Sequence, residues 1–167
     1  DAVFGCLAQA LPGKVQAESA GSIWILSLSS AHGRVPASVT AGATNFGVIS
    51  MALGGIGGRP GKDGLATMAF PSGIGAIPVE ITENQCPLYF KHKEFLPDSG
   101  GAGEWRGGMS QKIVIANREP VPFAISAATF DRMRFAAQGR DGGKPGSKGV
   151  ACLGSGQVLP DKGIHLV

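Results

Sequence analysis

Two glycine-rich runs, residues 54–64 and 97–108, place charged side chains at fixed points of the backbone. Glycine adopts positive φ without steric cost and lets another segment or a ligand approach the backbone closely. Loops shaped in this way commonly carry function. We therefore interpret the polar residues in and between the runs as candidates for contact with a substrate or a subunit boundary. These candidates are Arg59, Lys62, Asp63, Glu80, Asp98, Ser99 and Arg106.

The first run departs from known nucleotide-binding patterns. A P-loop places a glycine, four residues and then Gly-Lys before a serine or threonine. Here Ile56 stands at the first glycine position and Asp63 replaces the hydroxyl residue. The dinucleotide pattern also fails, because Pro60 stands where its third glycine belongs. The commoner arrangement is a structural loop in which Arg59, Lys62 and Asp63 hold one another.

The second run begins as a turn and ends with a large aromatic residue beside a planar cation. Asp98 and Ser99 can accept hydrogen bonds from backbone N–H groups in such a turn. We expect Trp105 to pack into a β-core, since tryptophan buries a large apolar area. We expect the whole run to be a rigid and partly buried connection that faces a functional site or a subunit boundary.

Arg106 has two interpretations. Its guanidinium group can bind a carboxylate or phosphate of a ligand in bidentate fashion. It can equally form a structural ion pair with Glu80, Glu83 or Asp98, which is the commoner role, and we expect Glu80 or Glu83 as its partner. Because residues 79–82 are predicted as a strand, Glu80 and Glu83 would face opposite sides and would not form a paired acid and base.

Other catalytic constellations are missing from the sequence. The three histidines are isolated, and no zinc or metalloprotease pattern predicts a metal site. No nucleophile elbow of the Gly-x-Ser-x-Gly type occurs. Cys86 lies inside a motif, just before a proline, but it has no nearby histidine in the sequence. The catalytic residues therefore stay unknown at this level.

Composition narrows the class of protein. Among 167 residues, 27 are glycine and only 16% are charged, which predicts a loop-rich domain with part of its surface covered. The net charge of +3 is weak and its cations are scattered, so a nucleic-acid partner is not expected. No apolar run is long enough to cross a membrane. The three cysteines are widely spaced and odd in number, which indicates reduced thiols in the cytoplasm.

Hydrophobic periodicity predicts mostly strands. A short helix is expected from Asp1, which can cap it, to the Pro12-Gly13 pair that ends it. Strands are expected over residues 22–29, 45–53, 65–70, 79–82, 88–96, 110–116, 121–135 with a break near 127, 150–153 and 163–167. Short turns and few helices predict an α+β fold, predominantly antiparallel β with one or two short helices and long glycine-rich loops. No linker divides residues 1–167, which we expect to be a single domain or a fragment.

The motifs together resemble a known family. Residues 78–80 and 83–87 lie between the two runs, and residues 138–146 carry a later Gly-Gly-x-Pro-Gly turn. Occurring in this order, these motifs are similar to the C-terminal part of the hydantoinase B/oxoprolinase family. The resemblance covers nearly the whole chain and is densest over residues 54–108. Family members are several times longer, so we expect residues 1–167 to be the C-terminal region of a B subunit.

The resemblance implies an ATP-dependent enzyme that opens cyclic amides such as hydantoins, 5-oxoproline or lactams. In that family an A subunit or fused A domain phosphorylates the substrate, and the B subunit completes the reaction. The implied partners are the remainder of the B subunit, an A-type ATP-binding subunit and a small cyclic amide. ATP and a divalent metal would bind elsewhere in the complex, because the family's N-terminal His and Asp metal motifs do not occur here.

Three alternatives stay open. Related family members carboxylate ketones instead of hydrolysing amides. The segment could instead be a scaffold that carries subunit contacts and no chemistry. It could also be an independent module that binds a small ligand.

We predict that the chain neither binds nor hydrolyses ATP, because both nucleotide patterns fail on spacing. Calorimetric titration with magnesium-ATP should give no saturable signal. A dissociation constant of ~100 μM or tighter, about −5.5 kcal/mol, would contradict this prediction.

Overall fold

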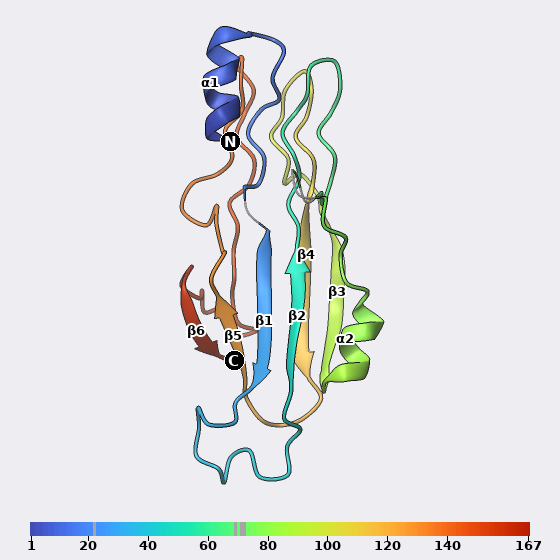
Figure 1. Ribbon diagram of the computed structural model, residues 1–167, viewed down its shortest axis with the longest axis vertical. Coiled ribbons are helices and arrows are strands. Elements are labelled where there is room, and N and C mark those ends of the chain that lie inside the picture. Colours follow the sequence, from blue (N-terminus) through green and yellow to red (C-terminus); the bar gives the residue numbers. More distant parts are fainter. Residues whose placement is uncertain (22, 69, 71–72) are drawn as a thin grey trace.

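The computed structural model describes residues 1–21, 23–68, 70 and 73–167. Within these residues, helices and strands alternate with long loops, and Figure 1 shows an elongated molecule whose strands run along its length. The elements in chain order are α1 (Ala2–Ala10), β1 (Trp24–Ser30), β2 (Gly47–Ala52), α2 (Val79–Gln85), β3 (Leu88–Leu96), β4 (Ser110–Asn117), β5 (Phe123–Ala127) and β6 (Gly163–Leu166). None of the described helices is long and apolar enough to cross a membrane.

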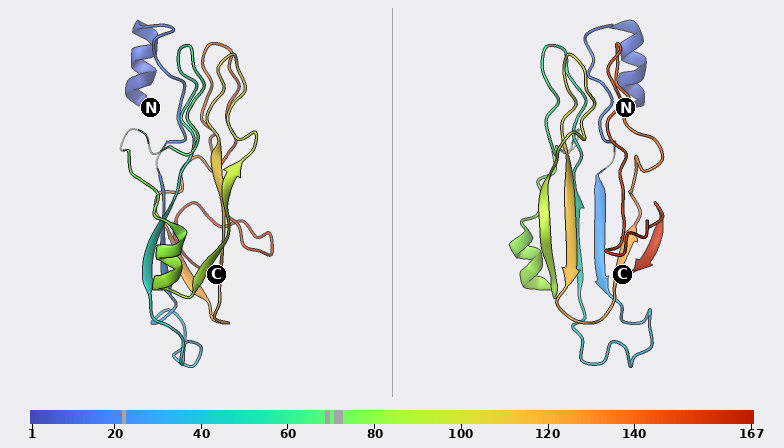
Figure 2. Two further views of the ribbon diagram at one scale, coloured as in Figure 1. Left: turned by 90° about the vertical axis from the view of Figure 1, so that its right-hand side faces the viewer. Right: turned by 180° about the vertical axis from the view of Figure 1, so that it is seen from behind.

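The strands form two antiparallel sheets. One sheet has the order β2-β1-β5-β6, and the other is the ribbon β3-β4. Figure 2 shows the ribbon facing the larger sheet, with α2 beside both at one margin. The predicted α+β class with predominantly antiparallel strands and two short helices is therefore confirmed.

The core lies between the two sheets. Side chains of β1 alternate, as the predicted period of two requires: Leu26, Leu28 and Ser30 are buried, while Ile25 faces the opposite side. The buried cluster consists of Leu26, Leu28, Val48, Cys86, Leu88, Phe123, Ala127 and Phe130. Trp24 stacks on Phe130 with ring centroids 4.5 Å apart and extends this cluster toward the loops.

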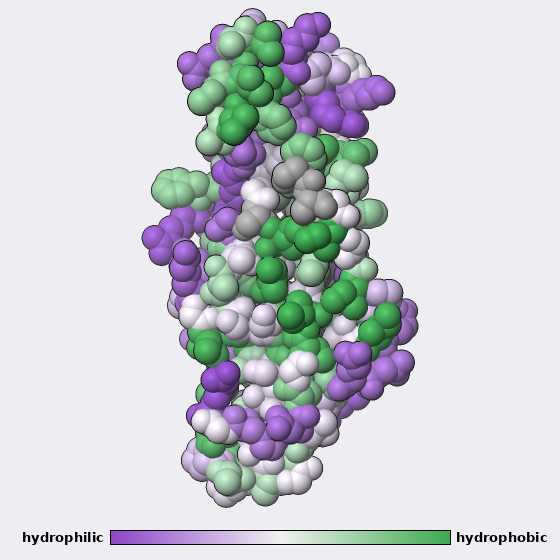
Figure 3. Space-filling model, viewed as in Figure 1, coloured by the Kyte–Doolittle hydropathy of each residue, from purple (hydrophilic) through white to green (hydrophobic). Residues whose placement is uncertain are grey.

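The outer face of the larger sheet stays apolar. Ile25 on β1 and Ile49 on β2 are 36% and 51% exposed. The space-filling view shows hydrophobic side chains over the middle of this face (Figure 3). One face of β1 is therefore buried, and the other face, which carries Ile25, is partly exposed.

The strand predicted over residues 79–82 is wrong, because this segment begins helix α2. Four residues are too few for a strand pattern to be told from a helical one. The helix buries Thr82 and is followed by Cys86, one turn later on the same side. The Cys86 thiol donates a hydrogen bond to the Thr82 carbonyl oxygen, 3.2 Å from sulfur to oxygen.

Three further predicted strands differ from the structure. Residues 65–70 contain a turn with φ 44° at Thr67, and residue 69 lies outside the described residues. The strand predicted over 121–135 ends at Ala127, near the predicted break. Residues 150–153 contribute only the isolated bridge Cys152–Val158. These segments are apolar enough for strands, but outside β5 the described residues make only scattered backbone hydrogen bonds, such as Thr67 N–H to Met109 O, in place of a continuous ladder.

Asp1 does not cap α1 through its side chain, contrary to the prediction. Its carboxylate instead binds Arg132 at 2.6 Å and accepts a hydrogen bond from the Ser19 backbone N–H. Arg132 also pairs with Glu18 at 3.2 Å. No residue of α1 is fully buried, so these ion pairs and the stacking of Phe4 on Phe70, with ring centroids 5.9 Å apart, tie the first residues to the rest of the chain.

We predict that Leu28→Ala lowers the free energy of unfolding by ~2–5 kcal/mol, because it opens a cavity in the core. Leu28 is 1% exposed and lies on the inner face of β1. Ile25→Ala on the outer face of the same strand is the matched control and should cost roughly 1 kcal/mol or less. Urea denaturation measures both, and equal losses would show that the two faces are not different in burial.

Candidate functional site

The glycine-rich runs fold into one structure, which we call the glycine-rich loop cluster and define as residues 54–68, 97–109 and 137–149. These loops extend side by side beyond the ends of the strands, at the end of the molecule that carries α1 (Figures 1 and 2). Residues 15–20 run beside them, because the Ala17 N–H donates to the Gly58 carbonyl oxygen at 2.9 Å. The cluster lies where the sequence analysis placed its candidate residues.

Backbone hydrogen bonds between loops hold the cluster together. The Gly108 N–H donates to Ile56 O, and the Gly64 N–H donates to Arg106 O, at 2.9 and 2.7 Å. The Lys144 N–H reaches Ala102 O at 2.8 Å and ties in the third loop. These bonds satisfy main-chain groups that the irregular loops would otherwise leave unpaired.

The glycines of the cluster are needed chiefly for close approach. A Cβ atom on Gly55 would overlap the backbone of Gly108, and one on Gly100 would overlap the carbonyl oxygen of Gly107. Neither Gly55 nor Gly100 has positive φ, whereas Gly61 has φ 76° at the tip of its turn. Glycine is therefore required at most of these positions because neighbouring backbone fills the place of a side chain.

The residues of the first run hold one another. Arg59 and Lys62 exchange two backbone hydrogen bonds of 2.9 and 3.0 Å across the turn. The Arg59 guanidinium donates to the Asp63 carbonyl oxygen from Nε and Nη2, at 3.0 and 2.8 Å. The Asp63 carboxylate accepts the Arg106 backbone N–H at 2.7 Å, which links the first run to the second.

The predicted partner of Arg106 is wrong. Its guanidinium lies 3.3 Å from Asp98 and not beside Glu80 or Glu83. The two side chains are 57% and 90% exposed, so the pair contributes less than ~1 kcal/mol to stability. Glu83 instead binds Arg118 at 3.1 Å. The Arg106 guanidinium is therefore held loosely and is accessible to a ligand or a partner.

The predicted burial of Trp105 is also wrong, because its side chain is 45% exposed. Its backbone lies against Gly58, where a Cβ would come within 2.6 Å of the Trp105 carbonyl oxygen. Ser99 is buried and fixes the start of the second run. Its hydroxyl donates to Leu96 O at 2.7 Å and accepts the Ser110 N–H at 2.8 Å.

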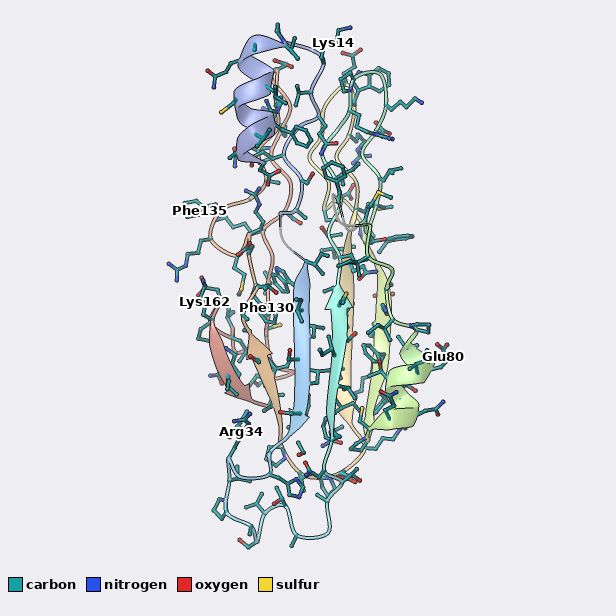
Figure 4. All side chains as sticks on the ribbon, in the orientation of Figure 1. Lys14, Arg34, Glu80, Phe130, Phe135 and Lys162 are labelled. Carbon is teal, nitrogen blue, oxygen red and sulfur yellow. The ribbon has the colours of Figure 1, made fainter. Side chains whose placement is uncertain are left out.

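Six of the seven candidate residues thus lie in the cluster, and Glu80 does not. Glu80 lies on α2, on the exposed side of the helix and away from the loops (Figure 4). The separation follows from the helix over residues 79–85, which packs beside the sheets instead of leading into the loops.

Two features of the site were missed by sequence reasoning. Arg140 belongs to the third loop, and within the described residues its buried Nε has no hydrogen-bond partner. A cavity of about 1260 Å³ continues from the cluster into the space between the sheets. Arg140 lay in a recognised motif but was not weighed as a site residue, and a cavity has no signature in sequence.

Other reactive groups give no catalytic arrangement. The Cys86 thiol is buried, and this burial raises the pKa of the Cys86 thiol, which disfavours the nucleophilic thiolate. Among the described residues, no three His, Cys, Asp or Glu side chains gather as a metal site would require. The chemistry that the arrangement can supply is binding and positioning by Arg59, Lys62 and Arg106.

The chain matches a known protein family. The family model for Hydantoinase B/oxoprolinase matches residues 1–164 of the 167-residue chain. The matched region contains all three loops of the glycine-rich loop cluster and both sheets except the last two residues of β6.

We predict that Gly100→Ala destabilises the chain by ~1–3 kcal/mol or more. The added methyl group would overlap the Gly107 carbonyl oxygen and force these two parts of the second loop apart. Gly103→Ala is the matched control, since the nearest atom to its Cβ would lie 3.4 Å away. It should be neutral or stabilising by up to ~1 kcal/mol, through lower entropy of the unfolded chain. Thermal unfolding of both variants checks this, and a harmless Gly100→Ala would contradict the close packing.

Proposed function

The chain belongs to the hydantoinase B/oxoprolinase family, and we propose that it is part of the B subunit of an ATP-dependent enzyme that opens cyclic amides. The observation that supports this most strongly is the family match over nearly the whole chain, which includes the glycine-rich loop cluster. The expected substrates are hydantoins, 5-oxoproline or lactams, and the expected partners are the remainder of the B subunit and an A-type ATP-binding subunit in the cytoplasm.

The proposed division of labour follows from amide chemistry. An amide carbon is a poor electrophile and its nitrogen a poor leaving group, so phosphorylation of the amide oxygen by the A-type subunit makes the carbon open to attack by water. The activated substrate then has to be kept from bulk water until it is correctly placed. A wall of closely packed backbone suits this purpose, because it holds its shape without side-chain rearrangement.

The cations of the cluster have a role in this proposal. Arg59, Lys62 and Arg106 are carried on loops whose backbones are fixed by hydrogen bonds. Positive groups positioned beforehand stabilise negative charge that develops during a reaction. We place them beside the phosphorylated substrate or at the boundary with the A-type subunit. Asp63 and Ser99 act as positioning residues, since their side chains accept the backbone N–H groups of Arg106 and Ser110.

Two other readings have observations in their favour. A scaffold role is favoured by exposed apolar side chains, among them Trp105 at 45% and Phe135 at 77%, which suit subunit contacts. An independent ligand-binding module is favoured by the cavity of about 1260 Å³. A ketone carboxylase would use the same architecture with bicarbonate and a ketone in place of a cyclic amide and water.

We predict that Arg106→Ala lowers ATP-dependent ring opening at least tenfold in the complete enzyme, with the chain folded and the subunits assembled. The reason is that the variant loses the positive charge that we place beside the phosphorylated substrate. Within the described residues this charge is engaged by one exposed ion pair, with Asp98, so its loss should leave the fold intact. The assay is release of ring-opened product from hydantoin or 5-oxoproline, in the intact B subunit reconstituted with its A-type partner. Assembly is measured separately by size-exclusion chromatography.

Arg34→Ala is the control, because Arg34 is exposed on the loop at the opposite end of the molecule (Figure 4). It should leave both rate and assembly unchanged. Full activity of an assembled Arg106→Ala enzyme would exclude the catalytic placement of Arg106. Loss of assembly with normal activity per complex would favour the scaffold. Turnover of a ketone with bicarbonate, but of no cyclic amide, would favour the carboxylase.

A further inference from the structure

In the part of the chain that the structure describes, one edge of strand β4 has no neighbouring strand. The strand forms a ribbon with β3, and within the described residues the backbone of residues 111–116 makes hydrogen bonds only to that strand. In an antiparallel ribbon, every second residue directs its N–H and C=O groups away from its partner. The free edge therefore presents a row of unpaired donors and acceptors.

Most of the usual protection of an edge strand is missing at β4. Natural edges carry prolines, charges, β-bulges or a covering helix. The one register shift recorded in this ribbon lies on the partner strand, between Phe90 and His92. The β4 sequence Ser-Gln-Lys-Ile-Val-Ile-Ala-Asn has no proline, and its single charged residue, Lys112, pairs with Glu94 across the ribbon at 3.3 Å. Helix α2 packs against β3 and β2, so it closes the other margin of the two sheets.

The free edge opens into an apolar space. The cavity of about 1260 Å³ is bordered by residues 110–116 and, between the sheets, by apolar side chains of both. Among them are Ile113 and Ile115 on β4 and Ile125 on β5, all only half-buried although they pack against the core cluster. The two sheets are thus held apart along this margin with their inner faces incompletely covered.

The size and chemistry of this space fit a polypeptide better than a small molecule. Pockets for drug-sized ligands usually measure ~300–1,000 Å³ and carry a few convergent polar groups. Here the polar groups form a straight row along an eight-residue strand, about 27 Å at the rise of an antiparallel strand. An extended peptide satisfies such a row with its own backbone, and its alternate side chains fill the cavity.

We propose that β4 is a strand-addition site for an extended segment of a partner polypeptide. The segment pairs with the free edge of residues 111–116 and directs uncharged apolar side chains at every second position between Ile113, Ile115 and Ile125. The added segment extends the layer formed by β3 and β4. Its side chains contact the larger sheet, which is the other layer. This inference does not depend on the ring-opening reaction or on the role of Arg106.

The test measures peptide binding by the chain carrying Trp105→Phe. The sequence has two tryptophans, so Trp24 is the one that remains. Trp24 lines the cavity, so its fluorescence reports occupation. The probe is a nine-residue peptide in which valine and threonine alternate between terminal lysines. The control peptide has the same side chains with every internal amide N-methylated, so it cannot donate backbone hydrogen bonds.

We expect saturable binding of the probe and at least tenfold weaker binding of the N-methylated control. Hydrogen exchange should show that the amides of residues 111–116 that point away from β3 exchange freely in the free chain and are protected with the probe, while those of α1 stay unchanged. This second readout needs no substitution in β4.

Four outcomes would overturn the proposal. Equal binding of both peptides would assign the cavity to apolar ligands in general, and absence of binding up to millimolar probe would remove the site. Protection, in the free chain at low concentration, of the amides of residues 111–116 that point away from β3 would show that the edge is already paired. Protection that appears only with a concentration-dependent dimer, seen by light scattering, would assign the edge to a second copy.

Discussion

Direct contact between backbones, without side chains in between, is the constraint on which the rest of this structure depends. At Gly55 and Gly108 a Cβ atom would overlap a carbonyl oxygen of a neighbouring loop, and at Gly64 it would overlap the Ile56 carbonyl oxygen across its own loop. Long loops are ordinarily mobile, because they lack regular partners for their main-chain groups. Here the loops are one another's partners, as the bonds Gly108–Ile56 and Gly64–Arg106 show. Because glycine lets these backbones come close, the loops satisfy one another's main-chain groups, as neighbouring strands do in a sheet.

The candidate site inherits its character from this packing. Trp105 and Arg106 have exposed side chains on a backbone held by hydrogen bonds, a combination that lowers the entropy lost when a partner or ligand binds. The ion pair between Arg106 and Asp98 is too exposed to explain why an arginine is needed for stability. Its value is better sought in what it contacts outside the chain, as the proposed function does.

The space between the sheets is filled by side chains in one part and incompletely filled in another. The core around Leu28 and Leu88 is closed, with 1% and 0% exposure, yet the cavity beside β4 leaves Ile113 and Ile125 half-covered. An apolar cavity and an unpaired strand edge each cost free energy in a molecule that stands alone. Both deficits are removed by a single added strand, and members of this family act within multi-subunit complexes.

The sequence by itself determined the family, the antiparallel character and most elements, because these depend on local patterns. The strand predicted over residues 88–96 begins and ends at the same residues as β3. The glycine runs predicted shaped loops around Arg59 and Arg106. Tertiary structure alone decided the partner of Arg106, the exposure of Trp105 and the helix that begins at Val79. The physical reason is range. A strand or a turn follows from neighbours in sequence, whereas an ion pair, a buried face or a missing strand partner depends on which distant segment folding brings alongside.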